Sequence, residues 1–164
     1  MKKRFPLTRF QLVCEILLVV LATLPFILLS LYWNKIPNKI PTHFGITGAA
    51  DAWGGKECIW IVPCMAAGLY WFITLLFLLV PPSACNTPEY VTDENHVDYV
   101  RIMRWMMLFV KLCMLSILYQ TLWTQVHAFA TNPAWSLPLN LGILLGGVIL
   151  FLIYTHKKFS KKTS

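Results

Sequence analysis

Charged residues are scarce in this sequence, and acidic ones are the scarcest. Of the 164 residues, 13% are charged and 57% are hydrophobic, whereas soluble domains are about 25% charged. Seven Asp and Glu residues stand against fourteen Lys and Arg. This composition excludes an ordinary soluble domain, because a water-exposed surface needs more polar side chains.

Motifs for metal binding and catalysis are also lacking. The five cysteines form no Cys-x-x-Cys pair, so neither a zinc ribbon nor a redox motif is indicated. No His-Glu-x-x-His segment occurs, which removes the usual signature of a zinc protease. We therefore expect a protein that is not an enzyme and that needs no cofactor.

Four apolar segments are long enough to cross a bilayer. A membrane-spanning helix needs roughly 20 mainly apolar residues. We predict an all-α integral membrane bundle that forms a single domain, residues 1–164, with connecting loops at residues 34–57 and 81–101. The four predicted spans are residues 10–33, 58–80, 102–128 and 137–155.

The basic residues set the expected orientation of these spans. Ten of them flank one side of the membrane: Lys2, Lys3, Arg4, Arg9, Arg101, Arg104, Lys157, Lys158, Lys161 and Lys162. Only Lys35, Lys39 and Lys56 lie on the other side. The positive-inside rule then places both termini and loop 81–101 in the cytoplasm and loop 34–57 outside. Terminal basic clusters suit anionic lipid headgroups, so we expect the lipid bilayer, and no nucleic acid, as a partner.

Two charged residues, Glu15 and Lys111, fall inside predicted spans. At about 1.5 Å per residue they lie roughly 8 and 15 Å deep from the same side, and the long lysine stem extends its reach. An ion pair between them is geometrically feasible. Such a pair either locks the first and third helices together or serves an ion-coupled carrier, and both interpretations stay open.

A polar stripe runs along the third predicted helix. At 100° per residue, Ser116, Gln120, Trp123 and His127 share one face, whereas Lys111 points almost the opposite way. Lys111 and the stripe therefore belong to different sites. Hydrogen bonding between helices is one role for the stripe, and a substrate path is the other.

Small residues predict close helix contacts in two spans. Gly142 and Gly146 form a Gly-x-x-x-Gly pair in the fourth span, with Gly147 beside them, and Cys64 with Gly68 has the same spacing in the second. Residues of this size let two helix backbones approach each other.

Loop 34–57 carries the most unusual residues of the chain. Pro41 fixes an extended backbone, Gly48 can adopt a positive φ, and Phe44 and Trp53 supply apolar anchors. We predict a compact, repeatedly turning loop that lies against the membrane. Its candidate functional residues are Pro41, His43, Phe44, Gly48, Asp51, Trp53 and Lys56.

From Ile40 to Lys56 the loop follows the pattern Ile-Pro-x-His-Phe-x-x-x-Gly-x-x-Asp-x-Trp-Gly-x-Lys. This pattern resembles the domain of unknown function found in bacterial SdpI-like membrane proteins. The resemblance implies a small helical protein of the bacterial cytoplasmic membrane, with a role in toxin immunity or envelope signalling. Independently of the resemblance, the concentration of special residues in this loop favours a membrane or peptide partner there.

Three side chains on the expected outer side form a candidate metal site. His43, Asp51 and His127 offer the nitrogen and oxygen ligands that suit zinc, and an open fourth position would suit hydrolysis. The alternative is a loop held by hydrogen bonds alone. The sequence thus leaves three functions open: an SdpI-like immunity or signalling protein, an ion-coupled carrier, and a metal-dependent hydrolase.

Overall fold

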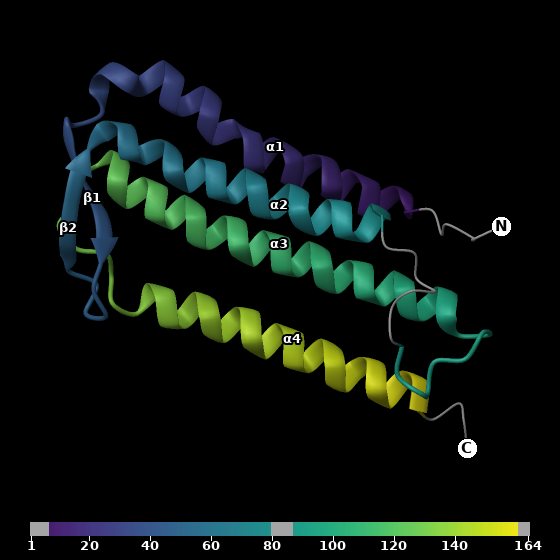
Figure 1. Ribbon diagram of the computed structural model, residues 1–164. Helices are drawn as coiled ribbons and strands as arrows, with labels where there is room; N and C mark the ends of the chain where they lie inside the picture. Colours follow the sequence, from purple (N-terminus) through teal and green to yellow (C-terminus); the bar gives the residue numbers. More distant parts are fainter. Residues whose placement is uncertain (1–6, 80–86, 161–164) are drawn as a thin grey trace.

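The computed structural model of the chain describes residues 7–79 and 87–160 (Figure 1). Within these ranges it contains four long helices, each long and apolar enough to cross a membrane. They are α1 (Arg9–Tyr32), α2 (Ile61–Leu79), α3 (His96–Val126) and α4 (Ser136–Ser160). This architecture supports a multi-pass membrane protein. Five of the basic residues used for the orientation lie outside the described ranges: Lys2, Lys3, Arg4, Lys161 and Lys162.

The four helices run side by side, and α4 lies along α3 (Figure 1). Helices α1, α2 and α3 pack around a shared apolar core, with Leu18 and Ala22 from α1, Tyr70 from α2, and Leu108 and Leu115 from α3. Helix α4 is the least buried of the four. The protein is therefore a three-helix unit with a fourth helix attached to one of its members.

The segment between α1 and α2 corrects the all-α prediction, because it folds into an antiparallel hairpin of β1 (Lys39–Phe44) and β2 (Ala50–Gly55). Short 3₁₀ turns, Trp33–Lys35 and Lys56–Trp60, flank the hairpin. Its turn closes where the Gly48 N–H donates to the Gly45 carbonyl at 2.9 Å, and Gly48 has φ +81°. A residue with a side chain rarely adopts that dihedral, which explains the glycine.

The hairpin covers one end of the bundle, where α1 ends and α2 begins (Figure 1). Ile36, Ile40 and Ile59 are buried there against Leu29 of α1 and Leu122 of α3. We call this the hairpin end of the bundle, and the opposite end, where α1 begins and α4 ends, the terminal end. A second apolar core thus fixes the hairpin to the helices.

The connection between α3 and α4 extends the hairpin. The Ala50 N–H donates to the Ala130 carbonyl at 2.8 Å, and the Asn132 N–H donates to the Gly48 carbonyl at 2.8 Å. Ala49 and Thr131 form a bridge between these two bonds. We refer to the hairpin with residues 130–132 as the cap.

Helix α3 begins at His96 rather than near residue 102, so predicted loop 81–101 is partly helical. The Asn95 side chain organises the turn before it, accepting a bond from the Thr92 N–H at 2.9 Å and donating to the Tyr90 carbonyl at 3.1 Å. Asp98 lies in the first turn, where a carboxylate complements the positive end of the helix dipole. Helix α4 likewise continues past residue 155, with Lys157 and Lys158 in its last turn.

The predicted small-residue contacts are wrong. A Cβ atom added to Gly68, Gly142 or Gly146 would meet nothing within 4 Å among the described residues. Gly147 makes the close contact instead, since a Cβ there would lie 2.3 Å from the ring of Phe109 on α3. The Gly-x-x-x-Gly spacing therefore marks a side of α4 that the described part of the chain leaves uncovered.

Gly147→Ala should consequently weaken the attachment of α4 to α3. Because the Phe109 ring must move, we expect the free energy of unfolding to fall by about 1–3 kcal/mol. Gly146→Ala is the matched control, and it should be neutral or stabilising by up to about 1 kcal/mol, since alanine favours helices. Denaturation of the purified protein in detergent measures both. Equal losses of unfolding free energy from the two substitutions would contradict the close packing of Gly147 against Phe109.

Candidate functional site

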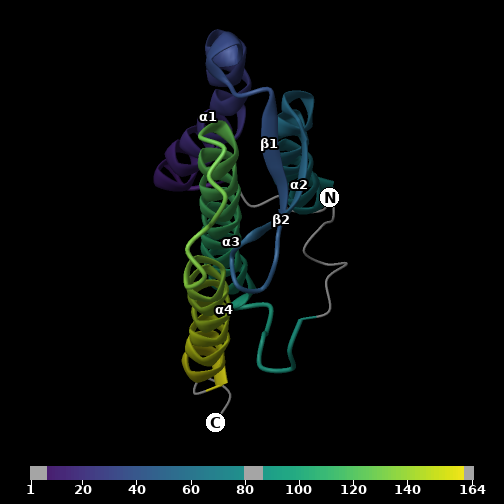
Figure 2. The same ribbon diagram turned by 90° about the vertical axis from the view of Figure 1, so that its left-hand side faces the viewer.

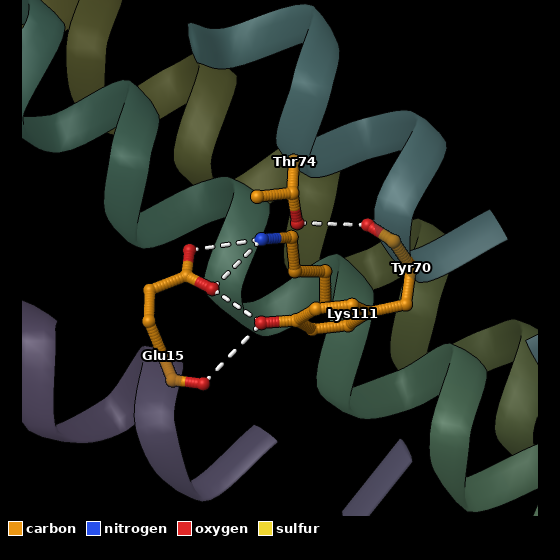
Figure 3. A network of polar contacts seen from close by, with 4 residues as sticks. All are labelled: Glu15, Tyr70, Thr74 and Lys111. Carbon is orange, nitrogen blue, oxygen red and sulfur yellow. Dashed lines mark hydrogen bonds and ion pairs between the residues drawn. The ribbon is translucent and has the colours of Figure 1, made fainter. Parts of the chain in front are cut away.

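A buried ion pair links α1 to α3 (Figure 3). The Lys111 Nζ lies 2.8 Å from Glu15 Oε1 and 2.9 Å from Glu15 Oε2. The lysine side chain is only 2% exposed and the glutamate side chain 22%. The structure thus forms the pair that the two charges inside predicted spans suggested.

Helix α2 joins this ion pair through Tyr70, which the sequence analysis missed (Figure 3). The Tyr70 hydroxyl donates to Glu15 Oε2 at 2.7 Å, and the Lys111 Nζ lies 4.6 Å from the centroid of the Tyr70 ring. The Thr74 hydroxyl donates to the Tyr70 carbonyl at 2.8 Å. A single tyrosine in an apolar helix shows no periodic signal, so only the fold could identify it. The network joins all three core helices, and its hydrogen bonds offset the cost of burying the charges.

A cavity of about 370 Å³ lies beside this network. Its lining comes from α1, α2 and α3, and it includes Glu15, Tyr70, Thr74 and Lys111. Pockets that bind small molecules are typically about 300–1,000 Å³ and mostly apolar, with a few polar groups. The cavity has this character.

A second polar cluster joins α3 to α4. The Asn140 Nδ2 donates to Gln120 Oε1 at 3.0 Å, and the Ser116 hydroxyl donates to Asn140 Oδ1 at 3.3 Å. Gln120 Nε2 also donates to Asn132 Oδ1 at 3.3 Å. Ser116 and Gln120 of the predicted stripe thus hydrogen-bond Asn140 of α4, and Gln120 also bonds Asn132 in the connection between α3 and α4. The sequence analysis did not identify either asparagine as a partner.

His127, the last member of the predicted stripe, lies apart from that cluster. Its ring packs against Trp123 at an interplanar angle of 42°, with the centroids 4.0 Å apart, and stacks with Phe129 at 5.3 Å. Its Nδ1 lies 2.9 Å from the Trp123 carbonyl. The end of α3 is therefore an aromatic stack rather than a continuation of the hydrogen-bonded stripe.

His43 and Asp51 face each other across the hairpin, with 2.5 Å between His43 Nδ1 and Asp51 Oδ1. The strand register shifts on either side of His43, and such bulges redirect side chains. Both side chains are exposed, at 70% and 52%. Within the described ranges no group of three His, Cys, Asp or Glu side chains could hold a metal ion. The predicted zinc ligands are therefore not assembled, because His127 belongs to the aromatic stack.

Some of the other candidate residues of the loop support the hairpin, and others lie on its surface. Pro41 is buried, and its carbonyl accepts a bond from Gln125 Nε2 at 3.2 Å. Phe44 is half-buried, while Trp53 is 40% exposed. Lys56 Nζ lies 4.7 Å from the centroid of the Trp33 ring. Pro41 and Gly48 thus shape the cap, whereas His43, Asp51 and Trp53 form its accessible face.

Comparison with known protein families finds a match for the hairpin and the helix segments that flank it. Residues 20–67 match the family model for the Domain of unknown function (DUF1648). The match agrees with the predicted resemblance to a domain of unknown function, and it is limited to residues 20–67. No curated protein and no solved structure matches the chain.

The DUF1648 match includes the whole hairpin, the second half of α1 and the start of α2. Glu15, Tyr70 and Lys111 lie outside it. The matched segment therefore centres on the cap, and the ion-pair network belongs to the flanking parts of the chain.

Proposed function

We propose that this protein is a non-enzymatic, SdpI-like protein of the bacterial cytoplasmic membrane that recognises a membrane-active peptide toxin through its cap. The observation that carries this proposal is the division of the hairpin between buried and exposed residues. Ile40 and Pro41 are buried, whereas His43, Asp51 and Trp53 are exposed. These three exposed residues are the proposed recognition face.

The proposed recognition face rests on a rigid support. The second apolar core fixes the hairpin from below, and the hydrogen bonds at Gly48 and Ala50 fix it from the side. A preorganised surface loses less entropy on binding, which favours recognition. Exposed tryptophan is also among the residues that contribute most to binding energy in protein interfaces.

The proposal requires the cap to lie outside the cell. Among the described basic residues, Arg9, Arg101, Arg104, Lys157 and Lys158 belong to the terminal half of the bundle. Lys35, Lys39 and Lys56 lie at the hairpin end. This excess favours a cytoplasmic location for the terminal end.

The arrangement of polar groups favours this function over an ion-coupled carrier. A carrier needs polar groups that connect the two sides of the membrane. The two described clusters face different partners instead, because Lys111 points to α1 and α2 while Gln120 points to α4. Glu15 and Lys111 also satisfy each other, which suits a lock between helices.

Toxin challenge of cells that express the protein tests the proposal. We expect the wild-type chain to protect sensitive cells against at least one secreted peptide toxin of a broad panel. The double variant His43→Ala/Trp53→Ala should lose roughly tenfold or more of that protection, because it removes an aromatic anchor and a polar contact. The growth-inhibiting toxin concentration is the measurement, at equal protein levels in the membrane.

Trp71→Ala is the matched control, because Trp71 on α2 is 46% exposed, similar to Trp53, and lies away from the cap. It should protect like the wild type. Orientation is checked by Ile46→Cys at a fully exposed position of the hairpin turn, which a membrane-impermeant maleimide should label in intact cells. Unchanged sensitivity across the panel, or labelling only after lysis, would refute the proposal.

A further inference from the structure

The cavity beside the ion pair opens sideways, toward the lipid. Helices α1 and α2 lie on either side of α3 (Figure 2). Lining residues on α1, such as Ile16 and Val20, are 55% and 51% exposed, and Leu78 on α2 is 59% exposed. Leu108 and Lys111 of α3 are buried at its base. A molecule dissolved in the bilayer could therefore enter between α1 and α2.

The charges of the lining determine which polar end such a molecule should have. Lys111 and Glu15 neutralise each other, being 2.8 Å apart. Arg104 also lines the cavity, two helical turns before Lys111 and therefore about 10 Å nearer the terminal end. The three side chains together carry one net positive charge, which an anionic group complements. A guanidinium has five N–H donors, so Arg104 can bind an anionic oxygen in addition to a protein partner.

We propose that this cavity is a binding site for an anionic phospholipid from the surrounding leaflet. One acyl chain occupies the apolar space between α1 and α2, and the phosphate binds Arg104. The geometry matches a lipid in two respects. The cationic group lies at the end of the cavity nearer the membrane surface, and the apolar walls continue from it toward the middle of the bundle. The bound chain covers the Glu15–Lys111 pair on its exposed side.

Lipid titration of the purified full-length protein tests the charge requirement. Native mass spectrometry in detergent would compare dioleoyl phosphatidylglycerol with dioleoyl phosphatidylcholine, which have the same acyl chains. We expect one phosphatidylglycerol to bind at least roughly tenfold more tightly, and Arg104→Gln to remove that difference, because a hydrogen bond to a charged group is lost. Arg101→Gln is the matched control. Arg101 lies one turn earlier, is 52% exposed and pairs with Asp98 at 3.0 Å.

A second pair of variants tests the cavity itself. Ile16→Trp fills its mouth and should reduce phosphatidylglycerol binding by roughly tenfold or more, because the indole occupies the space of the acyl chain. Leu17→Trp is the control, since Leu17 is 57% exposed at the same depth and does not line the cavity. Denaturation without added lipid shows that each variant is folded.

Three results of the binding measurements would overturn the proposal. They are equal affinity for the two lipids, wild-type binding by Arg104→Gln, and equal effects of the two tryptophan substitutions. Each of these results would mean that phospholipid binds the outer surface of the helices without selection by headgroup charge or by the cavity. The proposal would also be overturned if the protein formed a dimer that excludes lipid. In that case a second copy of the chain, and not a phospholipid, would fill the cavity. None of these measurements involves the cap, so they are independent of toxin protection.

Discussion

Replacing Lys111 with methionine should lower the free energy of unfolding by about 3–5 kcal/mol, because it leaves the Glu15 carboxylate without its cation in a largely apolar setting. The Lys111 side chain is 2% exposed, and its ammonium contacts both oxygens of Glu15. After the substitution, water therefore cannot reach the Glu15 carboxylate from α3 to replace the lost ammonium group.

A double-mutant cycle separates this effect from loss of packing. In the double variant Glu15→Gln/Lys111→Met neither charge remains, so it should recover most of the stability that Lys111→Met loses. Tyr70→Phe removes one hydrogen bond to Glu15 and should cost less, about 1.5–3 kcal/mol. Denaturation in detergent micelles of Glu15→Gln, Lys111→Met, their double variant and Tyr70→Phe gives the four losses of stability. Additive losses from the two single charge substitutions would show that the pair does not act as a unit.

Gly48→Ala should detach the connection between α3 and α4 from the hairpin. A Cβ atom at Gly48 would lie 2.1 Å from the Asn132 carbonyl oxygen, and the backbone has φ +81°. The positive φ costs alanine roughly 1–2 kcal/mol, and the clash also breaks the 2.8 Å bond between the Gly48 carbonyl and the Asn132 N–H. We expect a total loss of about 2–4 kcal/mol.

Hydrogen exchange locates that loss. The amide protons of Ala50 and Asn132, which form the two bonds of the cap to the α3–α4 connection, should exchange much faster in Gly48→Ala. Gly45→Ala is the control in the same turn, because a Cβ there would meet nothing closer than the Asp51 side chain, at 3.3 Å. It should leave both amides protected. Unchanged protection in Gly48→Ala would mean that the cap tolerates a side chain at this point.

The four helices could be predicted from the sequence, but their packing faces could not. Helix length follows from the runs of apolar residues, because only such runs are stable in hydrocarbon. The side of a helix that faces lipid is as apolar as the side that faces the core. Leu18, which is buried, and Leu17, which is 57% exposed, are adjacent leucines. The same ambiguity explains why Gly142 and Gly146 were assigned to a helix contact that Gly147 makes.

The candidate sites, too, could be predicted only in part from the sequence. The pairing of Glu15 with Lys111 could be anticipated, because a charge in a membrane needs a partner. The hairpin could not, since its bulges near His43 interrupt the alternation that marks a strand. The zinc hypothesis assumed that residues on one side of the membrane lie close together, whereas among the described residues no group of three possible metal ligands is assembled. His127 is instead held by Trp123 and Phe129.

The cap has a consequence for how the protein is made. Its hairpin comes from the connection between the first two helices, yet it hydrogen-bonds residues 130–132, which lie just before the last helix. A chain synthesised from its N-terminus presents the hairpin long before those residues exist. The cap therefore remains incomplete until α3 has been threaded through the bilayer and the segment beyond it has returned to the hairpin. A chain that has been synthesised only as far as α3 therefore cannot close the cap, because residues 130–132 supply the bonds that complete it.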